Sequence, residues 1–124
     1  YALLDLAEQF PQSLEDILII ETGGMKGQRP EMIKSELHSV LKKAFVVDKI
    51  LSEYGMTELL SQAYSFSDGI FQTPPWMKVF IRDAQDPLAL LNHHQIGGIN
   101  IIDLANINSC SFIATQDIGK TIIL

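Results

Sequence analysis

The chain has 124 residues, a formal net charge of −6, 47% hydrophobic residues and only 19% charged residues. This length suits one domain or less, and the charged fraction falls below the roughly 25% of an average domain. The negative charge argues against nucleic acid as a partner, because phosphate binding needs a basic surface. No apolar run is long enough for a membrane span and no signal peptide is visible. The single cysteine excludes an internal disulfide, and we expect a cytoplasmic protein.

Both ends of the sequence interrupt an apolar pattern. Residues 1–6 begin without a methionine, and residues 121–124 end on an apolar run. Together with the low charge, this predicts an internal piece of a larger protein whose other parts cover some of its apolar surface. We also expect the isolated chain to self-associate through that surface.

The first half of the chain predicts a βαβ unit. Apolar residues recur at helical spacing over residues 1–10. Four consecutive aliphatic residues at 17–20 predict a strand buried on both faces, as in a parallel sheet. An amphipathic helix over residues 30–45 and a second strand over residues 46–51 follow. The loops after both strands should then lie beyond the carboxyl ends of neighbouring parallel strands, where open α/β sheets bind ligands.

The second half predicts mainly β structure. A short helix is expected at residues 59–64. Later strands, joined by short turns, are expected at residues 78–83, 99–103 and 112–115. Such strands indicate an antiparallel sheet or half-barrel beside the parallel unit. The expected fold class is therefore α/β, with a βαβ unit in residues 1–64 and a mostly β portion in residues 65–124.

The loop after the first strand contains Gly23, Gly24 and Gly27. Glycines between a strand and a helix could cradle a ligand with backbone amides. The glycine-lysine signature of a Walker loop is absent. For the glycines taken alone, a flexible strand-to-helix connection is the favoured explanation.

The loop after the second strand offers an aromatic ring, a glycine, a hydroxyl and a carboxylate, from Tyr54, Gly55, Thr57 and Glu58. A ring can stack on a base, and glycine lets backbone approach a ligand closely. The hydroxyl can donate a hydrogen bond, and an ionised carboxylate only accepts. Together they would suit an adenine, a phosphate and Mg²⁺. The alternative is that Tyr54 packs in the core and Thr57 caps a helix through residues 58–60.

Four other candidates favour structural interpretations. His93 and His94 are adjacent, so their side chains diverge and cannot easily chelate one ion; a surface turn is expected. Cys110 is expected to be a buried or inert thiol, because no base neighbours it in sequence. His38 lies toward the polar flank of its helix and is expected to be solvated.

Two aspartates, Asp103 and Asp117, each come after a predicted strand. Either could accept hydrogen bonds from the hydroxyls of a sugar, and either could cap a turn.

Three segments together resemble the adenylate-forming enzymes, the group of acyl-coenzyme A synthetases, peptide-synthetase adenylation domains and luciferases. Residues 52–58 resemble the YGxTE motif of that group, and residues 22–25 lie where it has a glycine-rich adenine loop. Residues 115–119 resemble its TGDxG-like motif, with Gln116 in place of the usual glycine. The order and spacing of the three segments agree with the group. This resemblance implies an internal fragment of the large N-terminal domain of such an enzyme.

Within that group, the chain resembles the acyl-protein synthetase family of the bacterial bioluminescence fatty-acid reductase. The likeness lies in residues 21–27, 36–38, 54–58, 79–83 and 117–119. It implies an acid–thiol ligase that activates a fatty acid with ATP to an acyl-adenylate and passes the acyl group to a protein thiol, with an acyl-accepting reductase as partner. Phenylacetate-coenzyme A ligases are near relatives, so an acyl- or aryl-coenzyme A ligase is an alternative. A non-catalytic α/β module that binds a nucleotide or a protein is a third.

The resemblance also implies ATP or AMP and Mg²⁺ as cofactors. Gly23, Gly24 and Met25 would line the adenine through their backbone. Tyr54 would stack on the base, with Gly55 allowing close approach of the backbone.

The remaining implied roles concern the phosphate, the metal and the sugar. Thr57 would bond the α-phosphate, Glu58 would hold Mg²⁺, and Asp117 would take the ribose hydroxyls. The group's phosphate loop would lie upstream of residue 1, and its lysine-bearing small domain beyond Leu124. Cys110 does not match the acyl-accepting cysteine of the family. We therefore expect the 124-residue chain alone to be inactive.

Overall fold

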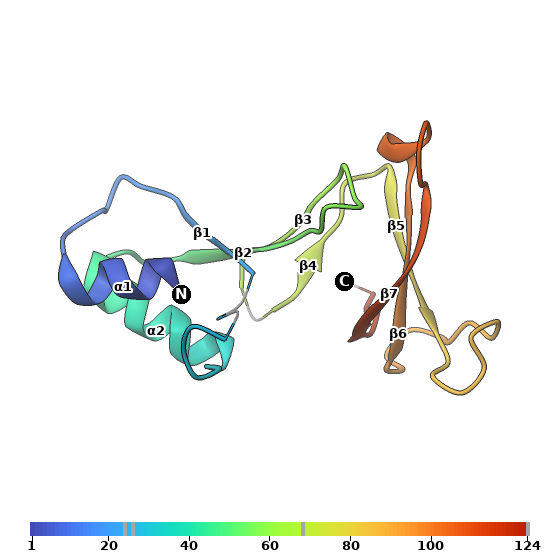
Figure 1. Ribbon diagram of the computed structural model, residues 1–124, viewed down its shortest axis with the longest axis horizontal. Helices are drawn as coiled ribbons and strands as arrows, with labels where there is room; N and C mark the ends of the chain where they lie inside the picture. Colours follow the sequence, from blue (N-terminus) through green and yellow to red (C-terminus); the bar gives the residue numbers. More distant parts are fainter. Residues whose placement is uncertain (24, 26, 68, 124) are drawn as a thin grey trace. The chain divides into compact units, whose positions relative to one another are not determined.

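The computed structural model describes residues 1–23, 25, 27–67 and 69–123 (Figure 1). The chain forms two compact units: Tyr1–Gly55 with Ala63–Gln72, and Met56–Gln62 with Thr73–Leu124. The expected division after residue 64 differs from this one, because two short strands that follow residue 62 pair back onto the first unit.

The first unit contains a four-stranded sheet in the order β1-β2-β3-β4. The parallel pair β1-β2 is joined by helix α2, so the βαβ prediction is confirmed. Strands β3 and β4 extend the sheet with antiparallel pairs. The elements of this unit are α1 (Ala2–Gln9), β1 (Ile19–Thr22), α2 (Lys34–Phe45), β2 (Ile50–Tyr54), β3 (Ala63–Ser65) and β4 (Phe71–Gln72).

The core of the first unit lies between both helices and β1-β2. Its buried residues include Leu4 of α1, Leu41 and Phe45 of α2, and Ile19 and Ile50 of the strands. Burial along β1 alternates. The expectation of a strand at residues 17–20 that is buried on both faces is therefore wrong for the described residues, because the helices cover one face.

Helix α2 begins later than predicted but ends at Phe45, as predicted. Ile33 has an extended backbone, so the helix begins at Lys34 instead of Pro30. Val46 adopts the left-handed conformation with φ 54°, which ends the helix. The second strand consequently begins at Ile50 instead of Val46.

The helix expected at residues 59–64 is wrong. Residues 56–59 form a turn closed by a 3.1 Å hydrogen bond from the Leu59 amide to the Met56 carbonyl. From Ala63 the chain pairs with β2, placing Ala63 opposite Tyr54. This pairing gives hydrogen-bond partners to backbone N–H and C=O groups that would otherwise bond to one another within a helix.

The second unit contains the antiparallel sheet β5-β6-β7, as predicted. Arg82 joins its strands, since its guanidinium donates to the carbonyls of Ile99 at 2.8 Å and Thr115 at 2.6 Å. Gly98 leaves room for that guanidinium, because a Cβ there would lie 2.6 Å from Arg82 Cζ. The elements are β5 (Met77–Arg82), β6 (Gly97–Asp103), the short 3-10 helix η1 (Leu104–Asn106) and β7 (Phe112–Gly119).

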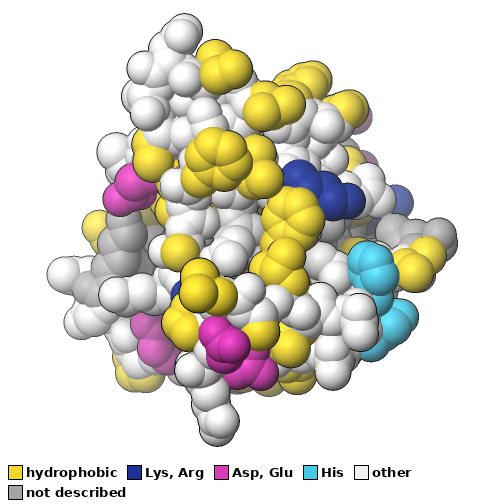
Figure 2. All heavy atoms as spheres, turned by 90° about the vertical axis from the view of Figure 1, so that its right-hand side faces the viewer, with side chains coloured by type: hydrophobic (Ala, Val, Ile, Leu, Met, Phe, Trp, Pro, Cys, Tyr) yellow, Lys and Arg dark blue, Asp and Glu magenta, His cyan; other side chains and the backbone are white. Residues whose placement is uncertain are grey.

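Large hydrophobic side chains remain exposed in both units, among them Leu18 at 64%, Phe112 at 72% and Ile118 at 74%. Figure 2 shows many such side chains at the surface. Self-association of the isolated chain stays a prediction. Among the described residues, no helix has the length and apolar character that crossing a membrane requires.

Candidate functional site

Two loops, called here the glycine loop (after β1) and the aromatic loop (after β2), leave the same edge of the first sheet. The parallel register ends with Thr22 opposite Glu53, so Gly23 and Tyr54 are the next residues at the carboxyl ends of β1 and β2. Gly23 has φ 78°, a conformation that glycine adopts without strain. The prediction that both loops follow neighbouring parallel strands is confirmed. Gly24 lies outside the described residues.

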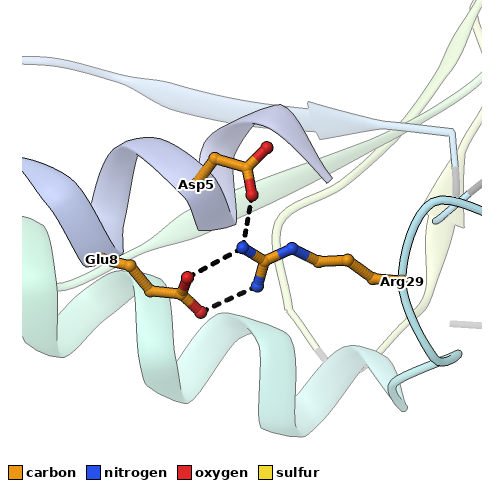
Figure 3. Close-up of polar contacts among 3 residues, drawn as sticks. All are labelled: Asp5, Glu8 and Arg29. Atoms are coloured by element: carbon orange, nitrogen blue, oxygen red, sulfur yellow. Dashed lines mark hydrogen bonds and ion pairs between the residues drawn. The ribbon is translucent and has the colours of Figure 1, made fainter.

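Met25 is buried, with 3% of its surface exposed, and belongs to the core cluster. Its side chain therefore packs in the core of the first unit. The following turn is closed by a 2.9 Å hydrogen bond from the Gln28 amide to the Met25 carbonyl. Arg29 then reaches α1, where it pairs with Asp5 and with both carboxylate oxygens of Glu8 (Figure 3). These contacts fasten the end of the glycine loop to helix α1.

A buried carboxylate lies one residue before this edge. Glu21 is 4% exposed, and its Oε1 lies 2.8 Å from Lys34 Nζ and 3.5 Å from His38 Nε2. Burial alone would raise the pKa of Glu21, but hydrogen bonds from Lys34 and Ser52 outweigh it and hold the pKa below 4.5. His38 also lies 3.4 Å from Ser52 Oγ. The expectation that His38 is solvated is wrong, because its ring packs against this cluster.

The shifted pKa of Glu21 predicts a pH-dependent stability difference. A carboxyl whose pKa is lower in the folded state stabilises the fold above its unfolded pKa, and this contribution disappears as pH falls through the folded value. We expect Glu21→Gln to lower the free energy of unfolding at pH 7, and the difference from wild type to shrink below pH 4.5. Urea unfolding across this pH range measures both effects.

The control for this prediction is Glu31→Gln, which removes the same charge at an exposed position. It should leave the free energy of unfolding at pH 7 unchanged. If the difference in free energy of unfolding between wild type and Glu21→Gln grows as pH falls, the assigned direction of the Glu21 pKa shift is contradicted.

Tyr54 is half-buried and packs against Phe71 of β4. The ring centroids lie 6.1 Å apart with planes at 68°, an edge-to-face arrangement. Gly55, the next residue, is exposed and ends the first segment of this unit.

Thr57 and Glu58 belong to the second unit and are both exposed. They lie in the turn at residues 56–59, so the alternative that Thr57 caps a helix is wrong. Asn106 Nδ2 donates a 2.7 Å hydrogen bond to the Glu58 carbonyl oxygen. The backbone at Glu58 is thereby held within the unit while its side chain faces solvent.

Asp103 is fully buried. Its carboxylate accepts hydrogen bonds from the backbone of Leu60 and Ser61, which follow this turn. Trp76 Nε1 donates to Ser61 Oγ in the same network. Burial alone would raise the pKa of Asp103, but the hydrogen bonds outweigh it and hold the pKa below 3.8. The carboxylate oxygens accept four hydrogen bonds, from Leu60 N, Ser61 N, Ser61 Oγ and Ala105 N. The turn-capping interpretation is confirmed, and these donors leave no place for a sugar.

Asp117 differs from Asp103 in being exposed. It lies within β7, which continues to Gly119, so the expectation that Asp117 follows a strand is wrong. Its amide donates to Thr115 Oγ1 at 3.1 Å. Thr115 in turn donates to the Ile99 carbonyl oxygen of β6 at 3.1 Å. These bonds fix the backbone that carries Asp117.

The adjacent histidines lie in an exposed turn, as predicted. His93 Nδ1 lies 2.9 Å from Thr121 Oγ1, and His94 has φ 69°. Cys110 is exposed, so of the two expected alternatives the buried thiol is wrong, and the inert thiol stays a prediction. In the part of the chain that the structure describes, no cluster of three or more His, Cys, Asp and Glu side chains could hold a metal ion.

The candidate residues thus fall into two sets. The first unit carries Gly23 and Tyr54 at the carboxyl edge of its parallel strands, and Met25 and Gly55 follow them in the chain. The second unit carries Thr57, Glu58 and Asp117. The YGxTE-like stretch passes from the first unit to the second between Gly55 and Met56.

Comparison with solved structures identifies the fold. Apo MatB from Rhodopseudomonas palustris matches with a TM-score of 0.57 at 16% identity, over 96% of this chain and 30% of that chain. An ATP-bound chimera of RpMatB and BxBclM matches with a TM-score of 0.58 at 16% identity, and ATP-bound MatB from R. palustris with 0.53 at 17%. Each of these two matches also covers 96% of this chain and 30% of the other. No protein-family profile matches the sequence, and the comparison with curated proteins finds no relative.

The chain therefore has the α/β fold of part of these proteins and spans 30% of their length.

Proposed function

We propose that the protein containing this chain is an adenylate-forming ligase, which activates a carboxylic acid with ATP and transfers the acyl group to a thiol. The observation that carries the proposal is that Gly23 and Tyr54 follow paired parallel strands at one sheet edge. Support comes from the fold shared with part of MatB, which has been solved with ATP bound.

The first unit would bind the adenine. Gly23, Gly24 and Met25 would line the base through their backbone, and Gly23 leaves the carboxyl end of β1. Tyr54 would stack on the base, and Gly55 would let the chain pass close to it.

The second unit would bind the phosphate, the metal and the ribose. Thr57 would donate a hydrogen bond to the α-phosphate. Glu58 would hold Mg²⁺, which commonly takes one or two carboxylates together with phosphate oxygens. A single exposed carboxylate fits that donor set. Asp117 would accept hydrogen bonds from the ribose hydroxyls.

The chemistry explains why hydrogen-bond donors and a cation are needed at the phosphate. A carboxylate is a poor acyl donor until its oxygen becomes part of a good leaving group, and joining it to AMP achieves this. Negative charge builds on the α-phosphate during that step, so hydrogen-bond donors and a cation held there lower the barrier.

The narrower form of the proposal is a cytoplasmic acyl-protein synthetase that acts on a fatty acid and serves an acyl-accepting reductase. It rests on the resemblance of residues 21–27 and 54–58 to that family. Coenzyme A is the alternative acceptor, because phenylacetate-coenzyme A ligases are near relatives of the same family.

Pyrophosphate exchange with ATP by the full-length protein tests the proposal. We expect exchange that depends on a carboxylic acid, with fatty acids the most active in a panel of short, long and aromatic acids. Adding coenzyme A or a thiol protein to the labelled acyl-adenylate then identifies the acceptor. AMP binding without exchange for any acid would favour a non-catalytic nucleotide-binding module.

A further inference from the structure

Phe71 lies where it can control the orientation of Tyr54. The hairpin of β3 and β4 folds back on β2, with Tyr54 opposite Ala63 and Ser65 opposite Phe71. This pairing brings the Phe71 ring to a centroid distance of 6.1 Å from the Tyr54 ring, with planes at 68°. Edge-to-face contact is a preferred geometry for two aromatic rings and restricts rotation of both.

The Phe71 ring has a second neighbour. Lys34 Nζ lies over it at 5.4 Å from the centroid, within range of a cation–π interaction. The same ammonium lies 2.8 Å from Oε1 of the buried Glu21. A buried carboxylate in β1 thus fixes the cation, the cation lies over Phe71, and Phe71 contacts Tyr54.

We infer that Phe71 is a positioning residue that sets the plane of the Tyr54 ring for stacking on a flat ligand base. The inference rests on the proposed function, because it requires Tyr54 to stack on adenine. Stacking needs a ring face held parallel to the base, and a ring that is already oriented loses less entropy when the ligand binds. Phe71 would act only through Tyr54, without touching the nucleotide.

A double-mutant cycle on AMP binding tests this inference. Calorimetric titration of the full-length protein with AMP is compared among wild type, Tyr54→Leu, Phe71→Leu and the double variant. We expect Phe71→Leu to weaken AMP binding about three- to tenfold and Tyr54→Leu by on the order of tenfold or more. The double variant should bind like Tyr54→Leu, because Phe71 has no effect once the tyrosine ring is gone. Phe71→Tyr should restore wild-type affinity.

Phe66→Leu is the matched control, since it makes the same change at an exposed position of the same hairpin. It should leave the AMP affinity unchanged. Thermal unfolding checks that each variant is folded. If Phe71→Leu does not fold, Phe71→Met takes its place in the cycle.

The outcomes distinguish a failure of the proposed adenine site from a failure of the positioning role of Phe71. If wild type does not bind AMP, or Tyr54→Leu binds it as well as wild type does, both the proposed adenine site and this inference are overturned. If Tyr54→Leu weakens binding but Phe71→Leu does not, the positioning role alone is overturned. Additive losses in the double variant also overturn it, because they would show that Phe71 acts independently of Tyr54.

Discussion

Replacing Glu58 with glutamine in the full-length protein is expected to slow acyl-adenylate formation by about 10²–10³-fold, the usual cost of one lost charge-stabilising contact. A carboxylate beside a triphosphate is tolerable only with a cation between them, since two anions in contact repel. Glutamine keeps the size of the side chain and removes its charge. AMP needs no such metal bridge, so its affinity should stay the same.

Pyrophosphate release and AMP calorimetry on the same preparation separate these two effects. Because the Glu58 carbonyl, and not its side chain, accepts the hydrogen bond from Asn106, the substitution leaves this structural contact in place. Unchanged thermal stability is therefore the control. Adenylation at the wild-type rate would show that the assigned metal role is wrong and that Glu58 contributes only its backbone.

Replacing Asp103 with alanine is expected to lower the free energy of unfolding by about 3 kcal/mol or more. The change removes a fully buried carboxylate and leaves its donors, including Ser61 N and Ser61 Oγ, without their acceptor. Unsatisfied buried donors cost about 1–3 kcal/mol each. Asp16→Ala, at an exposed position, is the control and should change stability by less than about 0.5 kcal/mol.

Urea unfolding followed by tryptophan fluorescence measures this effect, because Trp76 is the single tryptophan and belongs to the Asp103 network. The lowered pKa of Asp103 adds a second test. The ionised Asp103 carboxylate should contribute fully to the free energy of unfolding above pH 3.8. This contribution should disappear as pH falls through the lower pKa that Asp103 has in the folded protein. Equal stability of Asp103→Ala and Asp16→Ala at pH 7 would refute the anchoring role.

The sequence predicts the βαβ unit because its signals are local. Helix α2 carries apolar residues at helical spacing, and a run of aliphatic residues precedes it. Its beginning is harder to predict, since Ile33 has an extended backbone and the helix starts only at Lys34. Nothing in the neighbouring residues signals the left-handed conformation of Val46 either, and β2 begins only at Ile50. Strand β3 has only three residues, too few for an alternating pattern, and its pairing with β2 outweighs the helical propensity of residues 59–64.

In the candidate site, too, local patterns can be predicted from the sequence, whereas contacts between residues far apart in the chain cannot. Asp103 and Asp117 look alike in sequence, but Asp103 is buried because Ser61, 42 positions earlier, folds onto it. The cluster of Glu21, His38 and Ser52 was missed for the same reason: its members come from three separate elements. No local pattern reports a contact of that kind.

Calorimetric titration of AMP into the full-length protein and into its Asp117→Asn variant tests the central claim most directly. Asn keeps the size of Asp117 and removes the charge that would accept hydrogen bonds from the ribose. Loss of hydrogen bonds to a charged group predicts binding about 10–100-fold weaker than wild type, for AMP and ATP alike. A wild-type protein that does not bind AMP, or a variant that binds it equally well, would contradict a nucleotide site built from this chain.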